Sequence, residues 1–209
     1  MNKTKIILFD VDQVLIRPPH YFSAELKKQG YKNAEEALTT FFTKGDYRKC
    51  SEGKADALEL IAPYLQKFGW KKSAKEYFLE QFQFEAKYVD NNLISTVKKL
   101  KERNIKCYLA TDQAKIRAEF ILNNMDFKNI FDKSFISYSI GYRKCCNEFW
   151  TYVLKELKKE LKKITANEIA YFDNAQQNID TASKFGIKAF LFTDKFQFEK
   201  DLASILQTP

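Results

Sequence analysis

The sequence predicts an α/β fold, with a Rossmann-like parallel sheet as its core and a helical domain inserted into it. Short, wholly apolar runs such as residues 6–9 show no polar alternation, which is typical of strands buried on both faces of a parallel sheet. Elsewhere such runs alternate with helical patterns, and this rhythm implies right-handed crossovers with helices on both faces. Between residues 21 and 88 the strand signal disappears and apolar residues recur at helical spacing.

The first strand, residues 6–9, ends at two carboxylates, and residues 13–19 form a connection because Pro18 and Pro19 do not allow a helix to pass through them. The inserted helices are expected at residues 34–42, 55–68 and 74–84, with glycines as breaks, in a bundle of four or so. We therefore place the core domain at residues 1–16 and 89–209, and the helical domain at residues 17–88.

The second half of the chain carries the remaining strands and helices. Asp90 caps a helix over residues 93–103, and Thr111 with Asp112 forms an N-cap pair for a helix over residues 114–123. Gly186 fits the left-handed position that closes the helix at residues 176–185. The other expected elements are strands at residues 105–110, 131–139, 168–172 and 187–192 and an amphipathic helix at residues 147–163.

Composition narrows the class of function. The net charge is +8, but only five of the 35 basic residues are arginine, and scattered lysine is typical of a solvated surface rather than of base recognition, so no nucleic-acid partner is expected. The four cysteines lack metal-ligand spacing and are expected to be reduced thiols in the cytoplasm. No signal peptide or membrane span is expected, because the first apolar run is only four residues long.

Candidate functional residues follow the ends of the expected strands. Asp10 and Asp12 lie two positions apart on an extended backbone, so their like charges point into one volume and require a metal ion or a proton between them. Thr111, Lys144 and Asp173 follow later strands. Since the carboxyl ends of parallel strands line the ligand crevice of an open sheet, we expect these five residues to meet.

This ordered set resembles the haloacid dehalogenase-like hydrolase superfamily, and specifically its members with a helical cap. The family pattern is a strand ending in Asp-x-Asp, a second ending in Ser or Thr, a Lys ahead of a helix, and a last strand ending in one or two acids. Asn178, Ile179, Ala182 and Gly186 are similar to the residues that the family carries after its last acid. The resemblance spans the whole chain.

The resemblance implies a Mg²⁺-dependent phosphatase that hydrolyses a small phosphate monoester, its expected metabolite partner. Asp10 would be the nucleophile that forms an aspartyl-phosphate. Asp12 would protonate the leaving alkoxide and then activate water. The dehalogenases of the superfamily lack this second acid, so its presence favours phosphoryl transfer.

The resemblance also implies the binding groups. Mg²⁺ would be held by the carboxylates of Asp10 and Asp173 and the main-chain carbonyl of Asp12, with Asn174 holding a metal-bound water. Thr111, Lys144 and the main-chain N–H of Asp112 would bind the phosphate.

Four positions depart from the family pattern. Gln13 stands where glycine is common, Asp112 where Asn often follows the Ser or Thr, Cys145 where proline usually follows the Lys, and Asn174 where a second acid is frequent. These departures leave room for a slow enzyme with weak metal affinity.

Two alternatives share the same constellation. A phosphomutase differs by shielding its aspartyl-phosphate from water, and a binding or regulatory protein on this fold would have negligible catalysis. Within the cap, Arg48 and Lys49 lie near an expected helix break and are candidate specificity residues. Substrate identity and oligomeric state do not follow from the sequence.

Overall fold

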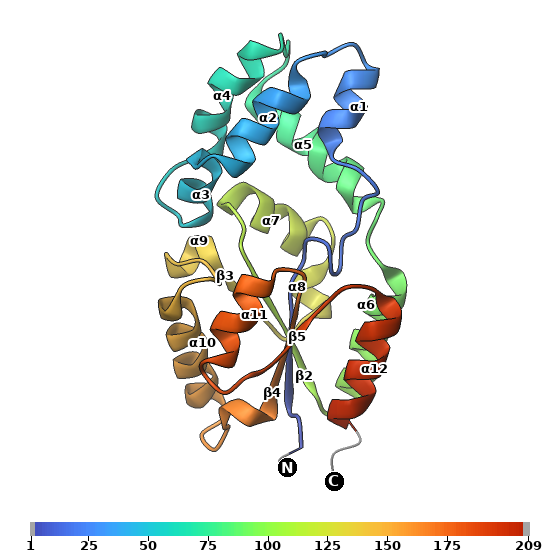
Figure 1. Cartoon of the computed structure of the whole chain (residues 1–209), viewed down its shortest axis with the longest axis vertical. Helices are drawn as coiled ribbons and strands as arrows, with labels where there is room; N and C mark the ends of the chain where they lie inside the picture. The colour runs from blue at the N-terminus through green and yellow to red at the C-terminus, as the bar shows by residue number, and fades with distance from the viewer. Residues whose placement is uncertain (1–2, 207–209) are drawn as a thin grey trace.

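The computed structural model, which describes residues 3–206, has a five-stranded parallel sheet covered by helices on both faces (Figure 1). The strand order is β3-β2-β1-β4-β5, so the first strand lies at the centre. The strands are β1 (Ile6–Phe9), β2 (Lys106–Thr111), β3 (Lys133–Ile136), β4 (Ile169–Asp173) and β5 (Lys188–Leu191). The predicted α/β fold class is confirmed.

The central strand β1 separates two hydrophobic cores. Ile7 and Phe9 belong to the cluster under α6 (Asn91–Glu102) and α12 (Lys195–Leu206), whereas Ile6 and Leu8 belong to the cluster under α10 (Asn147–Glu160) and α11 (Gln176–Ser183). All four side chains have 0% exposure. Burial on both faces therefore explains why this strand is apolar at every position. Alternate residues of a strand point to opposite faces of the sheet, and helices cover both faces.

Six helices lie between β1 and β2 in the chain, and the first five of them form a separate layer above the sheet, which we call the cap helices (Figure 1). They have their own hydrophobic cluster, which includes Phe41 and Tyr77. Two of them, α1 and α3, were not predicted, because seven and six residues are too few to display a helical period. The cap helices are α1 (Phe22–Lys28), α2 (Ala34–Thr43), α3 (Asp46–Ser51), α4 (Ala57–Lys67) and α5 (Ala74–Ala86).

Two chain segments connect the sheet to the cap helices, and they are hydrogen-bonded to each other. The N–H of Asp90 donates to the carbonyl of Leu15 at 2.8 Å, and the N–H of Arg17 donates to the carbonyl of Tyr88 at 3.0 Å. The division into domains at 16/17 and 88/89 remains a prediction, and these two hydrogen bonds lie at its two boundaries.

Several local expectations are corrected. Helix α7 (Lys115–Asn123) has Ala114 at its N-cap, so the predicted cap pair of Thr111 and Asp112 is wrong. The predicted strand over residues 131–139 splits into β3 and the short helix α9 (Ser137–Ile140), and the long helix predicted to residue 163 ends at Glu160. Helix α12 was missed, and α8 (Phe127–Ile130) and the 3₁₀ turn η1 (Ala166–Glu168) are too short to leave a periodic pattern.

Other caps agree with the sequence. The Asp90 carboxylate accepts hydrogen bonds from the N–H groups of Asn92 and Leu93, and Gly186 has a φ of 80°. Within residues 3–206, no helix combines the length and apolar character that a membrane crossing requires.

Gly53, in the turn after α3, makes a close contact between the cap helices and the helix α9 that follows β3. Its φ is 69°, and a Cβ at this position would lie 2.2 Å from the carbonyl oxygen of Tyr138 in α9. We expect Gly53→Ala to lower the melting temperature, because both the left-handed backbone and the close contact oppose a methyl group. Gly69→Ala is the matched control, since Gly69 has a φ of 75° and no atom within 4 Å of the added methyl. Equal losses in the two variants would show that the contact with Tyr138 is unimportant.

Glu168 provides a pH-dependent contribution to stability. Its carboxylate binds Lys5 Nζ at 2.6 Å and accepts from Thr165 N at 2.9 Å, and these contacts lower its pKa from 4.5 to about 2. Because the folded pKa is depressed, this contribution is present above pH 4.5 and is lost as the pH falls towards 2. We expect Glu168→Gln to cost about 1 kcal/mol at neutral pH, and this difference from the native protein should narrow as the pH falls. Urea unfolding across this range measures it, and a constant difference would contradict the assignment.

Candidate active site

The strand register brings the residues at the carboxyl ends of β1 and β4 together. The N–H of Asp10 donates to the carbonyl of Phe172 at 2.9 Å, which places Asp10 beside Asp173, the last residue of β4. Lys144, which comes from the loop before α10, lies between them, with Nζ at 2.6 Å from Asp10 Oδ1 and 2.7 Å from Asp173 Oδ2. Three of the predicted site residues therefore form one buried cluster.

Asp173 is fully buried and its two oxygens are occupied by protein donors. Oδ2 accepts from Lys144, from the hydroxyl of Tyr171 and from Asn178 Nδ2 at 3.0 Å, while Oδ1 accepts from Ala175 N at 2.7 Å. A carboxylate offers about four acceptor sites. Asp173 is thus used to hold Lys144 rather than to face the crevice.

The cluster has two acids and one cation. Burial opposes the charged form of Lys144, but Asp10 and Asp173 outweigh it and raise the pKa of Lys144. Burial likewise acts to raise the pKa of Asp173, but the contacts with Lys144 leave it lowered. Burial raises the pKa of Asp10 to about 8, and the charge of Asp173 adds to this. A second positive charge beside Asp10 would therefore favour its ionised form.

The backbone of Lys144 is positioned by two side chains. Asp112 Oδ1 accepts from Lys144 N at 2.9 Å, and the indole of Trp150 donates to the Lys144 carbonyl at 2.7 Å. Asp112 Oδ2 also binds Arg143 Nε at 3.2 Å. Asp112 therefore orients the backbone of Lys144, and its charge is balanced by Arg143.

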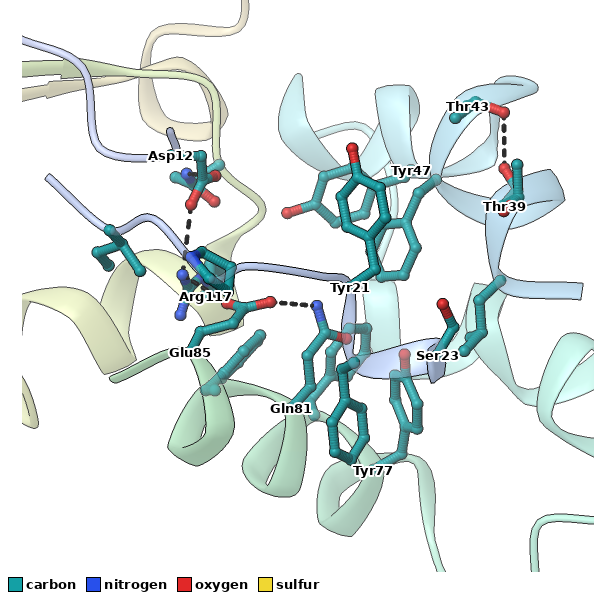
Figure 2. A pocket seen from close by; sticks show the side chains of 18 of the residues that line it. Asp12, Tyr21, Ser23, Thr39, Thr43, Tyr47, Tyr77, Gln81, Glu85 and Arg117 are labelled. Atoms are coloured by element: carbon teal, nitrogen blue, oxygen red, sulfur yellow. Dashed lines mark hydrogen bonds and ion pairs between the residues drawn. The ribbon is translucent and has the colours of Figure 1, made fainter. Parts of the chain in front are cut away.

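Asp12 has a different environment from Asp10. Its side chain is 53% exposed, with Oδ2 accepting from Gln113 Nε2 at 2.6 Å and Oδ1 lying 3.4 Å from Arg117 Nη2. Arg117 also binds Glu85 of cap helix α5 at 2.6 Å. The line from Asp12 through Arg117 to Glu85 crosses from the sheet domain to the cap helices (Figure 2).

Two nearby residues complete the local geometry. The Thr111 hydroxyl accepts from Gln113 Nε2 at 3.1 Å and keeps its own proton to donate. Gln13 has a φ of 60°, a left-handed conformation that glycine adopts more readily.

The donor atoms suit a hard cation, though only loosely. In the part of the chain that the structure describes, no three acidic, histidine or cysteine side chains converge on a ready metal site. Since Asp173 binds Lys144, the predicted oxygen donors that remain are the Asp10 carboxylate, the Asp12 carbonyl and the side chain of the exposed Asn174. Mg²⁺ keeps several waters and needs few protein oxygens, so this set fits a weakly held ion.

A cavity of about 340 Å³ opens beside Asp12 under the cap helices. The candidate specificity residues Arg48 and Lys49 do not line it. They lie on the surface of α3, where Arg48 binds Glu52 at 2.9 Å and Lys49 binds Asp46 at 3.0 Å.

Sequence reasoning missed several residues of this region. Tyr171 follows the alternation of a buried strand, and its hydroxyl two positions before Asp173 was the available signal. Gln113, Arg117 and Glu85 carried no signal, because their roles depend on contacts between segments far apart in the chain.

Comparison with known proteins supports one family. A family model described as haloacid dehalogenase-like hydrolase matches residues 4–186. A curated protein, the drimenol cyclase DrtB of Aspergillus calidoustus, is 25% identical over 130 residues, which are 62% of this chain but only 23% of the fungal protein. The chain thus spans about a quarter of that relative.

Solved structures share the fold. The HAD family enzyme BT-2542 of Bacteroides thetaiotaomicron, in complex with magnesium and inorganic phosphate, has a TM-score of 0.70 at 20% identity, over 90% of this chain and 93% of that one. A HAD-like hydrolase from Porphyromonas gingivalis has a TM-score of 0.74 at 15% identity over the full length of both chains. A dehalogenase with an intermediate complex has a TM-score of 0.70 at 12% identity, also over both full chains.

Lys144 is expected to hold the cluster together. Lys144→Met would leave Asp10 and Asp173 facing each other without a cation, and breaking a buried ion pair in this way costs about 3–5 kcal/mol. Urea unfolding measures the loss, and Lys158→Met on the exposed face of α10 is the control. Adding Asp173→Asn to Lys144→Met should cost less than the sum of the two single changes, because one of the stranded charges is then removed. Strict additivity would contradict the shared-cation arrangement.

Proposed function

Because the chain belongs to the haloacid dehalogenase-like hydrolases, we propose that it is a phosphatase that hydrolyses a small phosphate monoester through a phosphorylated Asp10. The observation that carries the proposal is the contrast between two carboxylates two residues apart. Asp10 is buried against Lys144, whereas Asp12 is exposed and lines the cavity. The Lys144 ammonium favours the ionised form of Asp10 that a nucleophile requires, whereas Asp12 lies outside this cluster, where a leaving group and water can reach it.

In the first step, an Asp10 oxygen attacks phosphorus, and the bond from phosphorus to the ester oxygen breaks. Asp12 gives its proton to the departing alkoxide and becomes a carboxylate. In the second step, Asp12 takes a proton from a water molecule that attacks the same phosphorus and releases Asp10 with inorganic phosphate. Splitting the reaction in this way replaces one difficult step by two easier ones.

Lys144 and Thr111 would bind the transferring group. The Lys144 ammonium is held in place by Asp173 and by its backbone bonds, so it is ready to stabilise negative charge on phosphate oxygens without further reorganisation. The Thr111 hydroxyl, fixed by Gln113, donates to another phosphate oxygen. Asp112 would contribute its main-chain N–H.

Mg²⁺ is the proposed cofactor, supported by the oxygen donors of Asp10, Asp12 and Asn174 and by the magnesium complex of the similar BT-2542. When bound, it supplies positive charge beside the carboxylate and the phosphate oxygens. A small phosphorylated metabolite is the proposed partner. The proposed cytoplasmic location is supported by four cysteines that are all free thiols.

Hydrolysis of a generic aryl phosphate tests the mechanism. We expect Mg²⁺-dependent release of inorganic phosphate by the native protein, and its loss by a factor of about 10³ or more in Asp10→Asn, which removes the nucleophile. Asp12→Asn should slow turnover by about 10²–10⁴, the usual contribution of general acid–base catalysis.

Thermal unfolding of each variant checks that the fold is retained. Release of halide from a 2-haloacid without phosphatase activity would contradict the proposal in favour of a dehalogenase. Phosphate release that survives Asp10→Asn would contradict the role of Asp10.

A further inference from the structure

The cavity beside Asp12 extends the active site away from the phosphate cluster. It lies between the loop after β1, helix α7 and the cap helices α1, α2, α3 and α5 (Figure 2). Asp12, the residue proposed to protonate the leaving group, forms part of its wall. An ester whose phosphate contacts Asp10 and Lys144 would therefore place its organic group in this cavity.

The wall of the cavity is mainly apolar. Aromatic rings enter it from four of the cap helices, and Leu38 and Ile16 add aliphatic surface. The rings within these helices are Phe22, Phe42, Tyr47, Tyr77, Phe78 and Phe82. A volume of about 340 Å³ corresponds to roughly ten water molecules. Burying an apolar group here would release that water from an unfavourable surface.

The charges of the wall argue against an anionic group. Asp12, Glu85 and Arg117 are the only charged residues among those that line it, and the Arg117 guanidinium already bridges the two carboxylates. A carboxylate or a second phosphate on the organic group would lie beside two acids, and the one cation of this wall, Arg117, already binds both of them. Burying an unpaired charge is costly, so such esters are disfavoured.

Unpartnered polar atoms indicate where one polar group of a ligand would bind. In residues 3–206, four buried side-chain polar atoms lack a hydrogen-bond partner, and three of them belong to Gln81, Gln113 and Arg117 of this wall. Gln81 and Arg117 lie close together, since both bind Glu85, at 2.8 Å and 2.6 Å. A single hydroxyl group both donates and accepts, so it could serve both residues.

We propose that the organic group of the substrate is an uncharged, predominantly apolar alcohol, aromatic or aliphatic, with at most one further polar group. This inference rests on the proposed phosphatase function and names the substrate class of that same site. Sugar phosphates, nucleotides and esters of carboxylated alcohols would be poor substrates.

The test measures kcat/KM with Mg²⁺ for straight-chain alkyl phosphates of increasing length, with glycerol phosphate and a hexose phosphate for comparison. We expect kcat/KM to rise about fourfold per added methylene, the equivalent of about 0.8 kcal/mol, until the cavity is filled. The polyhydroxylated esters should fall below alkyl esters of the same carbon number. An equal or falling kcat/KM along the series, with turnover intact, would overturn the inference and leave the proposed function standing.

Matched variants on α2 locate the effect. Thr39 lines the cavity at the side away from Asp12, whereas its neighbour Thr40 does not line it (Figure 2). Thr39→Phe should lower kcat/KM for the longest ester by about tenfold and leave the shortest nearly unchanged, because it shortens the cavity. Thr40→Phe should preserve the native dependence on chain length. Identical behaviour of the two variants would overturn the assignment of this cavity.

Binding separates the two proposals. Alkyl phosphonates cannot be hydrolysed, so their affinity for the native protein, measured by calorimetry, does not depend on turnover. Affinity that increases with chain length, together with no hydrolysis of any ester, would contradict the proposed function and support the apolar site. Affinity that is independent of chain length would overturn the inference whatever the turnover.

Discussion

The structure depends on one buried ammonium group that serves two carboxylates. Lys144 lies between Asp10 and Asp173 at the ends of adjacent strands, where neither acid would be stable without it. Three features bring these groups together. The register of β1 and β4 places the two acids side by side, and the alternation along β4 points the Tyr171 hydroxyl towards Asp173. The side chain of Asp112 holds the backbone of Lys144. One cation for two acids also leaves a place where further positive charge is favourable, which is the property that a magnesium-dependent phosphoryl site requires.

A second cation joins the sheet domain to the cap helices. Arg117 of α7 contacts Asp12 on one side and Glu85 on the other, and its guanidinium lies 4.9 Å from the ring centre of Phe82. The same helix packs Phe120 against Phe82 with ring centres 5.3 Å apart. Movement of the cap helices would therefore change the contacts of Asp12. Arg117 thus connects the proposed acid–base group to the apolar cavity and to the cap helices.

Residues that depart from the family pattern have structural roles. Asp112 does not leave a free negative charge beside the phosphate site, because its carboxylate is used by Lys144 N and Arg143. Gln13 occupies a left-handed backbone position at a small conformational cost. Asn174 follows an Asp173 that binds Lys144, so the charge of the proposed Mg²⁺ would be balanced mainly by Asp10. The departures therefore bear on metal affinity more than on the arrangement of the site.

The sequence by itself determined the order of the strands and of most of the longer helices along the chain, and the residues at or just after three of the strand ends. Apolar runs and helical periods are local, so β1, β2 and β4 and their terminal residues Asp10, Thr111 and Asp173 are readable without a structure. Helices too short for a period, such as α1 and α3, were not readable from the sequence, and the twelve-residue helix α12 was also missed. Only the tertiary structure decided that Asp173 binds Lys144, that Arg117 binds Glu85 and that an apolar cavity adjoins Asp12. The physical reason is that a side chain's partner is chosen by packing between segments distant in the chain, which local patterns do not record.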